Sequence, residues 1–426
     1  MTGKNLFKQL KKFDPDLCEV LKFSLDRQIS TLSLIPTDNA ASPLSQYLKG
    51  SALGNDFIGH NALEHYSRIE QLAVKRACEL FKAEHAILRT GNPVAASRVV
   101  LMALAKSGDK ILSFNLRKSE HCTGEQMKYD FVKFAVEPHN FKIDFKKVRY
   151  LALKHKPTLI IFSPVNYPKN IDYKDIKKIA EEVGAKLWID LGQNAGLVAA
   201  KKIPSPVPFA DVVTFAGSDG LHGPQRGIIL CRKNLAELLE KTVIETGHAS
   251  LKKNVMAALA ITFHEVTCEE FEDYSQAVLD NARALEKGLK KAGAELFCSP
   301  TENHLVLVKL ETKNFSAVEK LEQAGLLVKA ENLLTSDDKI FYPILRLSSL
   351  DPTTRALNED DMFTIGLTLG EFLKSSQDAR AIKSVQKVVT ELVENLPLFS
   401  EDWLPEEEIL REQDADLMMK AMIYGF

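Results

Sequence analysis

The sequence predicts an α/β protein with a largely parallel sheet. Short apolar runs recur along the chain, and segments with apolar residues at helical spacing separate them. The runs are too short for helices and are rich in β-branched and aromatic residues, which is typical of buried strands. They lie at residues 86–88, 110–114, 131–136, 158–162, 186–190, 211–215 and 227–231.

The composition indicates a soluble globular protein of two or three domains. The chain has 426 residues, 45% of them hydrophobic and 26% charged, with a formal net charge of −2. Such a charge provides no basic field for nucleic acid or an anionic membrane, so neither is an expected partner. No apolar run approaches the roughly 20 residues of a membrane helix, and the N-terminus has no signal-peptide core. The six cysteines are scattered, without a CxxC pair, so we expect reduced thiols, no metal site and a cytoplasmic location.

The first part of the chain divides into an arm and a large domain. Residues 1–45 are interpreted as an N-terminal arm, with a helix around 15–28. The large α/β domain is assigned to residues 46–265, and an early helix is expected over 66–81. Residues that carry chemistry in such sheets follow the carboxyl ends of the strands, so Asp190 is a candidate from position alone.

A smaller α+β domain is predicted over residues 266–399. One long helix over 255–291 is expected to lead into it. Strands are expected near 294–297, 304–310 and 344–347, and helices over 361–374 and 379–395.

The last segment, residues 400–426, is an acidic extension with eight acids and two bases. Pro405 suits the first turn of a helix, and Leu410, Leu417 and Met418 could form one apolar stripe. We expect this helix to dock on the protein's own dimer, with a protein partner or a frayed end as the alternatives.

Several stretches together resemble serine hydroxymethyltransferase, a pyridoxal-phosphate (PLP) enzyme of the aspartate-aminotransferase fold type. The most specific are EEVGAKLWIDLGQNAGLVAA (181–200) and PSPVPFADVVTFAGSDGLHGPQRGIILC (204–231). The resemblance covers about residues 5–399. It implies PLP fold type I, with a large domain built on a mixed seven-stranded sheet, a small α+β C-terminal domain and a homodimer with shared active sites. The implied reaction moves a one-carbon unit between serine and tetrahydrofolate.

The family's Schiff-base lysine is absent from this chain. The family pattern T-T-T-T-H-K-T-L-x-G-P-R-G-G aligns without a gap with residues 214–227 and places Asp219 at the lysine position. A carboxylate cannot form the imine that the cofactor aldehyde requires. It would also repel the negative groups of the cofactor at short range.

Other cofactor-binding motifs of the family are also altered. The S-G-S phosphate loop corresponds to Asn92–Val94, the G-Q-G-G-P loop to residues 247–251, and the tyrosine-rich segment is largely replaced by residues 56–61. The serine and histidine that face the cofactor in the family correspond to Val165 and Gln193. The resemblance therefore predicts that no cofactor is bound covalently.

Four positions keep some family chemistry. Asp190 matches the partner of the pyridine nitrogen, His121 the ring-stacking histidine, and Arg346 the arginine that binds a substrate carboxylate. Asp38 replaces the acid–base glutamate and is one methylene shorter. Each has a structural alternative: Asp190 could bind backbone donors, His121 could be an interior histidine, and Arg346 could pair with Asp219 or Asp38.

Four further cations border the predicted cleft: Arg89, Arg117, Lys118 and Arg226. They could bind an anionic ligand or form a solvated face.

We therefore expect a homodimeric protein that has lost PLP-dependent catalysis and acts in binding, regulation or scaffolding. One alternative is an enzyme that reuses the cleft, with Asp219, Asp38 and His121 as acid–base groups and Arg346 as a carboxylate anchor. Another is a transferase that binds PLP or pyridoxamine phosphate without a covalent bond.

Overall fold

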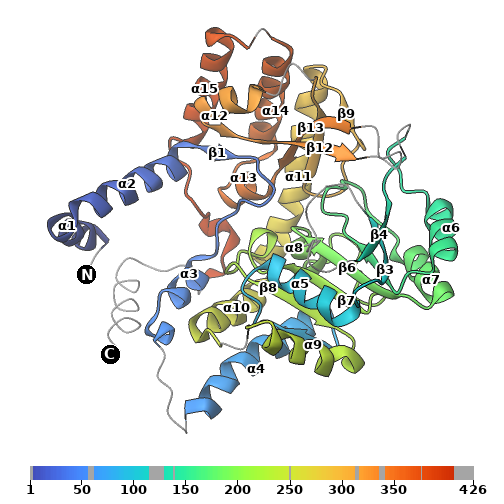
Figure 1. Ribbon diagram of the computed structural model, residues 1–426. Helices are drawn as coiled ribbons and strands as arrows, with labels where there is room; N and C mark the ends of the chain where they lie inside the picture. The colour runs from blue at the N-terminus through green and yellow to red at the C-terminus, as the bar shows by residue number, and fades with distance from the viewer. Residues whose placement is uncertain are drawn as a thin grey trace.

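The computed structural model describes eight stretches of the chain: residues 3–55, 62–114, 129–137, 140–248, 251–311, 316–334, 341–375 and 377–406. They form a seven-stranded, a four-stranded and a two-stranded sheet with surrounding helices, and an arm that extends from the body (Figure 1). No described helix has the length and apolarity needed to cross a membrane.

The seven predicted strands form one sheet, in the order β2-β8-β7-β6-β5-β3-β4. β8 pairs antiparallel with β2 and β7, and the other pairs are parallel. The prediction of a mixed, largely parallel seven-stranded sheet is thus confirmed. The strands are β2 (His85–Ile87), β3 (Lys110–Phe114), β4 (Asp130–Phe134), β5 (Leu159–Phe162), β6 (Lys186–Gly192), β7 (Val212–Ala216) and β8 (Gly227–Cys231).

Helices cover both faces of this sheet. Side chains alternate along each strand, so Ile111 packs on one face while Leu112 and Phe114 pack on the other. On the Ile111 face lie α5 (Pro93–Leu104) and α9 (Lys233–Glu245). The opposite face packs against α4 (Ala62–Phe81), α6 (Phe145–His155), α7 (Tyr173–Val183) and α10 (Lys253–Glu265). This two-sided cover explains why the strands read as continuous apolar runs.

The C-terminal unit has a second core around a four-stranded antiparallel sheet, in the order β12-β13-β10-β9. Its strands are β9 (Leu296–Phe297), β10 (Leu305–Lys309), β12 (Lys329–Leu334) and β13 (Phe341–Ser348). Its helices are α11 (Glu269–Lys291), α12 (Ala317–Gln323), α13 (Leu350–Thr354), α14 (Glu359–Lys374) and α15 (Ala379–Val393). The sequence did not predict β12 or α12.

The prediction of one helix over 255–291 is wrong. α10 ends at Glu265 and α11 begins at Glu269, with Cys268 at its N-cap. Acidic residues fill the first turn of α11, which favours a helix start at this point. The buried Glu265 carboxylate also accepts hydrogen bonds at 2.7 and 2.8 Å from Ser42 Oγ, which holds the end of α10 against the arm.

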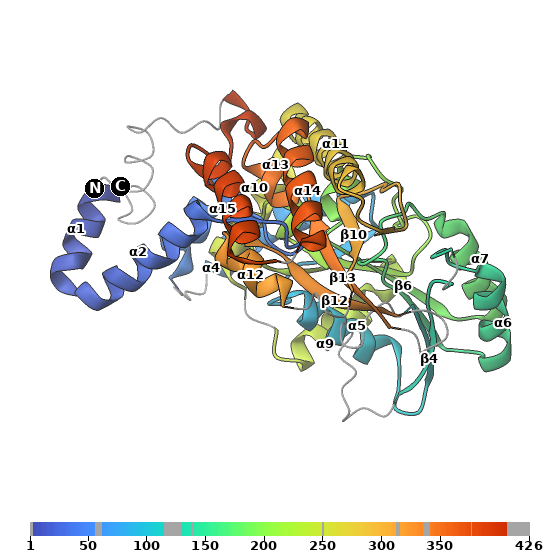
Figure 2. The ribbon, with the colours of Figure 1, turned by 90° about the horizontal axis from the view of Figure 1, so that it is seen from above.

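The arm begins with α1 (Gly3–Phe13) and α2 (Pro15–Ser30), which extend away from the body in both ribbon views (Figures 1 and 2). β1 (Leu32–Ser33) then pairs parallel with β11 (Leu326–Leu327), so the arm joins the core of the C-terminal unit. The short helices α3 (Pro43–Lys49) and η1 (Ala52–Gly54) follow. The Arg355 guanidinium donates to the carbonyls of Ile29, Thr31 and Pro397 and ties the base of the arm to the chain beyond α15.

Candidate functional site

The candidate site lies at the carboxyl ends of β6 and β7. Beyond β6 the chain enters α8 (Ala195–Ala199), and beyond β7 it forms the short helix η2 (Asp219–Leu221). The two segments touch through their backbones, because a Cβ on Gly196 would overlap the carbonyl oxygen of Gly220. This contact holds Asp219 next to the end of β6.

Asp219 is held by neighbours from three parts of the chain. Its backbone has a left-handed φ of 56°, and its carbonyl accepts a 2.6 Å hydrogen bond from Asn39 Nδ2 of the arm. Its carboxylate accepts a 2.9 Å hydrogen bond from Ser218 Oγ. Burial raises the pKa of Asp219 to about 6, and Asp38 adds to the rise, whereas Ser218 and Arg346 oppose it.

Asp190 has donors on both carboxylate oxygens. Oδ1 accepts from Thr214 Oγ1 at 3.0 Å and from the Gly192 amide at 3.4 Å, and Oδ2 accepts from Ser163 Oγ at 3.3 Å. Thr214 in turn accepts from the indole N–H of the buried Trp188 at 2.9 Å. Burial raises the pKa of Asp190 despite these donors. The backbone donor suggested from the sequence is therefore present, together with two side-chain donors.

Arg346, on β13, is buried with 1% of its surface exposed. Its Nη2 donates to the carbonyl of Val165 and to Gln193 Oε1, both at 2.9 Å. Its Nη1 lies 3.8 Å from the Glu331 carboxylate. Arg346 also interacts electrostatically with Asp219, one of the two partners that the sequence suggested. Val165 and Gln193 occupy two positions where the family pattern has polar cofactor-facing residues.

His304 lies close enough to Arg346 to interact with it electrostatically, and it was not identified from the sequence. Its ring Nδ1 is 2.9 Å from Ser348 Oγ, and its buried Nε2 has no hydrogen-bond partner within the described residues. Burial, reinforced by Arg346, lowers the pKa of His304 to about 3, so the ring is neutral at physiological pH. A single histidine directly before an apolar strand has no sequence pattern that would predict its position beside Arg346.

Asp38 borders a pocket of about 500 Å³ between the arm and the loop after β7. Its carboxylate accepts from Ser33 Oγ at 2.8 Å. Asp351 and Arg355 line the same pocket. Burial raises the pKa of Asp351 to about 6, with Asp38 adding to the rise and Arg355 opposing it. Asp38 thus interacts electrostatically with two other carboxyl groups, those of Asp219 and Asp351.

The loop before α5 is capped by the protein itself. Asn92 is the N-cap, and its side chain accepts from the Ala95 amide at 2.8 Å. Pro93 occupies the first turn and has no N–H to donate. Arg89 is bound by Glu70 through two hydrogen bonds of 2.6 and 2.7 Å.

Several predicted site residues lie outside the described part of the chain. These are His121, Arg117, Lys118, residues 56–61 and residues 249–250 of the glycine-loop position. Within the described stretches, no group of three or more histidine, cysteine or carboxylate side chains is arranged to hold a metal ion.

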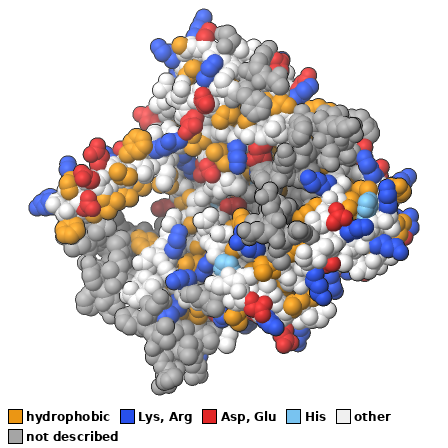
Figure 3. All heavy atoms as spheres, in the orientation of Figure 1, with side chains coloured by type: hydrophobic (Ala, Val, Ile, Leu, Met, Phe, Trp, Pro, Cys, Tyr) orange, Lys and Arg blue, Asp and Glu red, His pale blue; other side chains and the backbone are white. Residues whose placement is uncertain are grey.

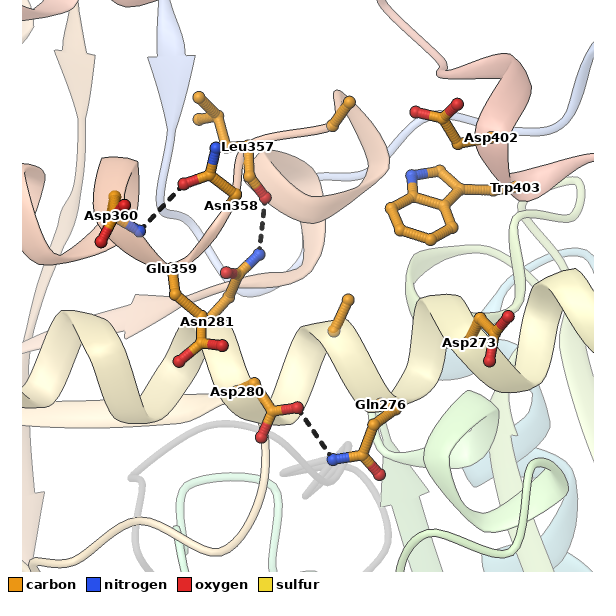
Figure 4. Close-up of a pocket in the computed structure, with 12 residues that line it drawn as sticks. Asp273, Gln276, Asp280, Asn281, Leu357, Asn358, Glu359, Asp360, Asp402 and Trp403 are labelled. Carbon is orange, nitrogen blue, oxygen red and sulfur yellow. Dashed lines mark hydrogen bonds between the residues drawn. The ribbon is translucent and has the colours of Figure 1, made fainter.

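A second pocket, of about 720 Å³, lies between α11, residues 356–360 at the start of α14, and residues 402–403 (Figure 4). Trp403 borders it, and its indole N–H donates to the Thr353 carbonyl at 2.8 Å. Trp403 belongs to the short helix η4 (Glu401–Trp403), so the start of the acidic extension packs on the body. The helix expected from Pro405 onward lies almost entirely outside the described residues. The pocket is also lined by five carboxylates: Asp273, Asp280, Glu359, Asp360 and Asp402.

Comparison with known protein families agrees with this architecture. The family model for serine hydroxymethyltransferase matches residues 10–369, which is most of the chain. The match spans the arm, the seven-stranded sheet, the segments around Asp190 and Asp219, and β13 with Arg346. It confirms both the resemblance seen in the sequence and the predicted fold class. The chain therefore belongs to the serine hydroxymethyltransferase family.

Proposed function

We propose that this family member has lost PLP-dependent catalysis and acts as a binding, regulatory or scaffolding protein. Members of the family depend on PLP and are typically oligomeric. The observation that carries the proposal is Asp219, a largely enclosed carboxyl group at the position of the family's lysine, hydrogen-bonded to its neighbour Ser218. A carboxyl group has no nitrogen with which to bind the cofactor aldehyde.

The start of α5 supports the loss of the cofactor phosphate site. Where the family has small residues that expose backbone N–H groups, Asn92 caps the Ala95 amide and Pro93 lacks an N–H. The family mode of phosphate binding would have to displace this cap. The residues present therefore do not suit PLP bound in the family's manner.

The surroundings of Arg346 support the loss of amino-acid binding. A substrate carboxylate needs the outer edge of the guanidinium for two parallel hydrogen bonds. Here Nη2 already donates to Val165 and Gln193, and Glu331 faces Nη1. Glu331 offsets the charge of the arginine and the other two acceptors occupy Nη2, so a substrate would compete with three existing contacts.

A homodimer is part of the proposal. The arm exposes large apolar side chains, with Phe13 92%, Phe23 69% and Val20 61% exposed. Apolar surface is visible along the arm on the left of the molecule (Figure 3). Because an isolated projecting helix gains little stability alone, a second copy that covers this face would stabilise it. A monomeric mass at micromolar concentration in sedimentation would contradict the dimer.

The test of lost catalysis is an absorbance spectrum of purified protein with and without excess PLP. We expect no internal-aldimine band, and no borohydride-stable adduct on a cleft lysine by peptide mass spectrometry. The Asp219→Lys variant is measured alongside, because it restores only the lysine amine and leaves the other altered residues unchanged. A reducible adduct on a lysine of the predicted cleft, such as Lys118, would refute the proposal.

An enzyme that reuses the cleft is the second candidate. It is favoured by the pKa of Asp219, which at about 6 lies near the value suited to acid–base chemistry at neutral pH. Arg346, 1% exposed and already bonded, would first have to exchange partners to anchor a carboxylate substrate. For this reason we place it second.

A further inference from the structure

The pocket between α11 and the start of α14 is acidic, and one of its five carboxylates has a cationic partner. Arg283 Nη1 lies 2.8 Å from Asp280 Oδ1, and Gln276 Nε2 donates to Asp280 Oδ2 at 3.0 Å. The other four carboxylates form no ion pair within the described residues: Asp273, Glu359, Asp360 and Asp402. The positive end of the α14 dipole favours the two acids at its start, but Asp273 lies beyond the first turn of α11. The fold itself therefore gives no reason for a negative charge at Asp273.

A buried acceptor without a donor also lines this pocket. Asn281, on α11, has 1% of its surface exposed. Its Nδ2 donates to Thr353 Oγ1 at 2.9 Å and to the Leu357 carbonyl at 2.7 Å, and Figure 4 shows the second of these bonds. Its Oδ1 accepts no hydrogen bond within the described part of the chain and keeps some solvent contact. Because a nearly buried carbonyl oxygen without a donor is costly, this atom suits a ligand that brings an N–H group.

Trp403 supplies an aromatic wall. Its indole N–H donates to the Thr353 carbonyl, and its ring lies 5.7 Å from that of Tyr274 between centroids, so the ring is fixed where it lines the pocket. The face of an indole attracts cations, most of all beside carboxylates. Trp403 lies beyond residues 10–369, which the family model matches, so this wall is not part of the family pattern.

We propose that this pocket binds an organic polyamine, a flexible aliphatic chain with an ammonium group at each end. Asp273 and Asp280 are seven residues apart on one side of α11, so their carboxylates are separated by about 10 Å. An extended chain can place one ammonium at each carboxylate, with its methylene groups against Trp403 and Leu357 and an N–H group at Asn281 Oδ1. The volume of about 720 Å³ is ample for such a ligand. The proposal does not depend on the loss of PLP.

A pair of substitutions tests the assignment in the full chain. Asp273→Asn combined with Glu359→Gln removes one unpaired carboxylate of α11 and one of α14. The matched control, Asp175→Asn combined with Glu237→Gln, removes the same two charges from exposed positions on α7 and α9. Calorimetry at constant ionic strength measures the binding of spermidine. We expect spermidine to bind the wild type, the pocket variant to weaken binding by at least about fivefold, and the control to stay within about twofold.

Tryptophan fluorescence locates the ligand. The chain has two tryptophans, and Trp188 is fully buried in the large sheet, so a change in emission on addition of spermidine reports on Trp403. We expect this change in the wild type and its loss in Trp403→Phe. Melting temperatures of all variants without ligand show whether a weaker affinity reflects misfolding.

Four outcomes would overturn the proposal. Spermidine could fail to bind the wild type, or the control could lose as much affinity as the pocket variant, which would indicate attraction to the general surface charge. Binding without a change in Trp403 emission would place the ligand elsewhere. Mg²⁺ that binds as tightly as spermidine, with the same dependence on Asp273 and Glu359, would assign the site to inorganic cations.

Discussion

Asp219→Asn should make the protein more stable at neutral pH and leave it nearly unchanged in acid. The substitution keeps the size of the side chain and an oxygen that can accept from Ser218, but removes the titratable group. In the folded protein the pKa of Asp219 is about 6, above its ordinary value of 3.8. Between these values the folded state holds a proton that the unfolded state has lost.

The sign and size of the effect follow from this difference. Because the folded-state pKa is raised, the wild type loses stability as the pH rises from about 4 to about 6, and the loss is complete above that range. A pKa rise of this size corresponds to at most about 3 kcal/mol. Since Asp219 keeps some solvent contact, we expect about 2 kcal/mol. Asp351 titrates in the same range but is present in both proteins, so its contribution largely cancels.

The assay is urea unfolding of wild type and variant at a series of pH values and one protein concentration. The buried Trp188, which is linked through Thr214 to Asp190, serves as the fluorescent reporter of the large sheet. Asp26→Asn, an exposed substitution on α2, is the control and should show no pH-dependent difference. A gap between Asp219→Asn and wild type that does not change with pH would refute the raised pKa. A variant less stable than wild type at pH 8 would mean that Arg346 stabilises an ionised Asp219.

Three further outcomes are expected. Asp219→Lys should not restore cleavage of serine, because the cap of α5 and the filled Arg346 contacts remain; measurable retro-aldol turnover would contradict this. Gly196→Ala should destabilise the protein by about 3 kcal/mol or more in urea unfolding, since its Cβ would overlap a backbone carbonyl; a change below about 1 kcal/mol would show that the loop can move. Deleting residues 400–426 should lower the free energy of unfolding by about 2 kcal/mol, because the Trp403 contacts are lost. A chain that ends after Glu406 keeps these contacts, so it should lose less than half as much if residues 407–426 are frayed or bind a partner. A loss as large as that of the full deletion would indicate that residues 407–426 dock on their own protein.

The sequence alone predicted the sheet because local patterns encode burial. Each strand of the large sheet is covered on both faces, so its residues form an apolar run that is visible without a structure. The helix break at residues 266–268 was missed because helical periodicity continues through it, and the buried Glu265 that fixes the end of α10 bonds Ser42, more than 200 residues away.

The sequence alone predicted which residues occupy the site but not which contacts they make. The alignment of motifs identified Asp219, Asp190 and Arg346, because residue identity at a fixed position in a motif needs no geometry. It could not show that Val165 and Gln193 accept from the Arg346 guanidinium, since these partners are 181 and 153 residues away in the chain.

Tertiary structure also decided which of the predicted cleft cations has a hydrogen-bond acceptor. Arg89 and Arg226 carry the same charge and border the same predicted cleft. Glu70, on α4, folds against Arg89 and binds it through two hydrogen bonds, whereas within the described residues no acceptor reaches Nε or Nη2 of Arg226. Pairing depends on which distant segments the packing brings within about 3 Å, and composition or spacing does not contain that information.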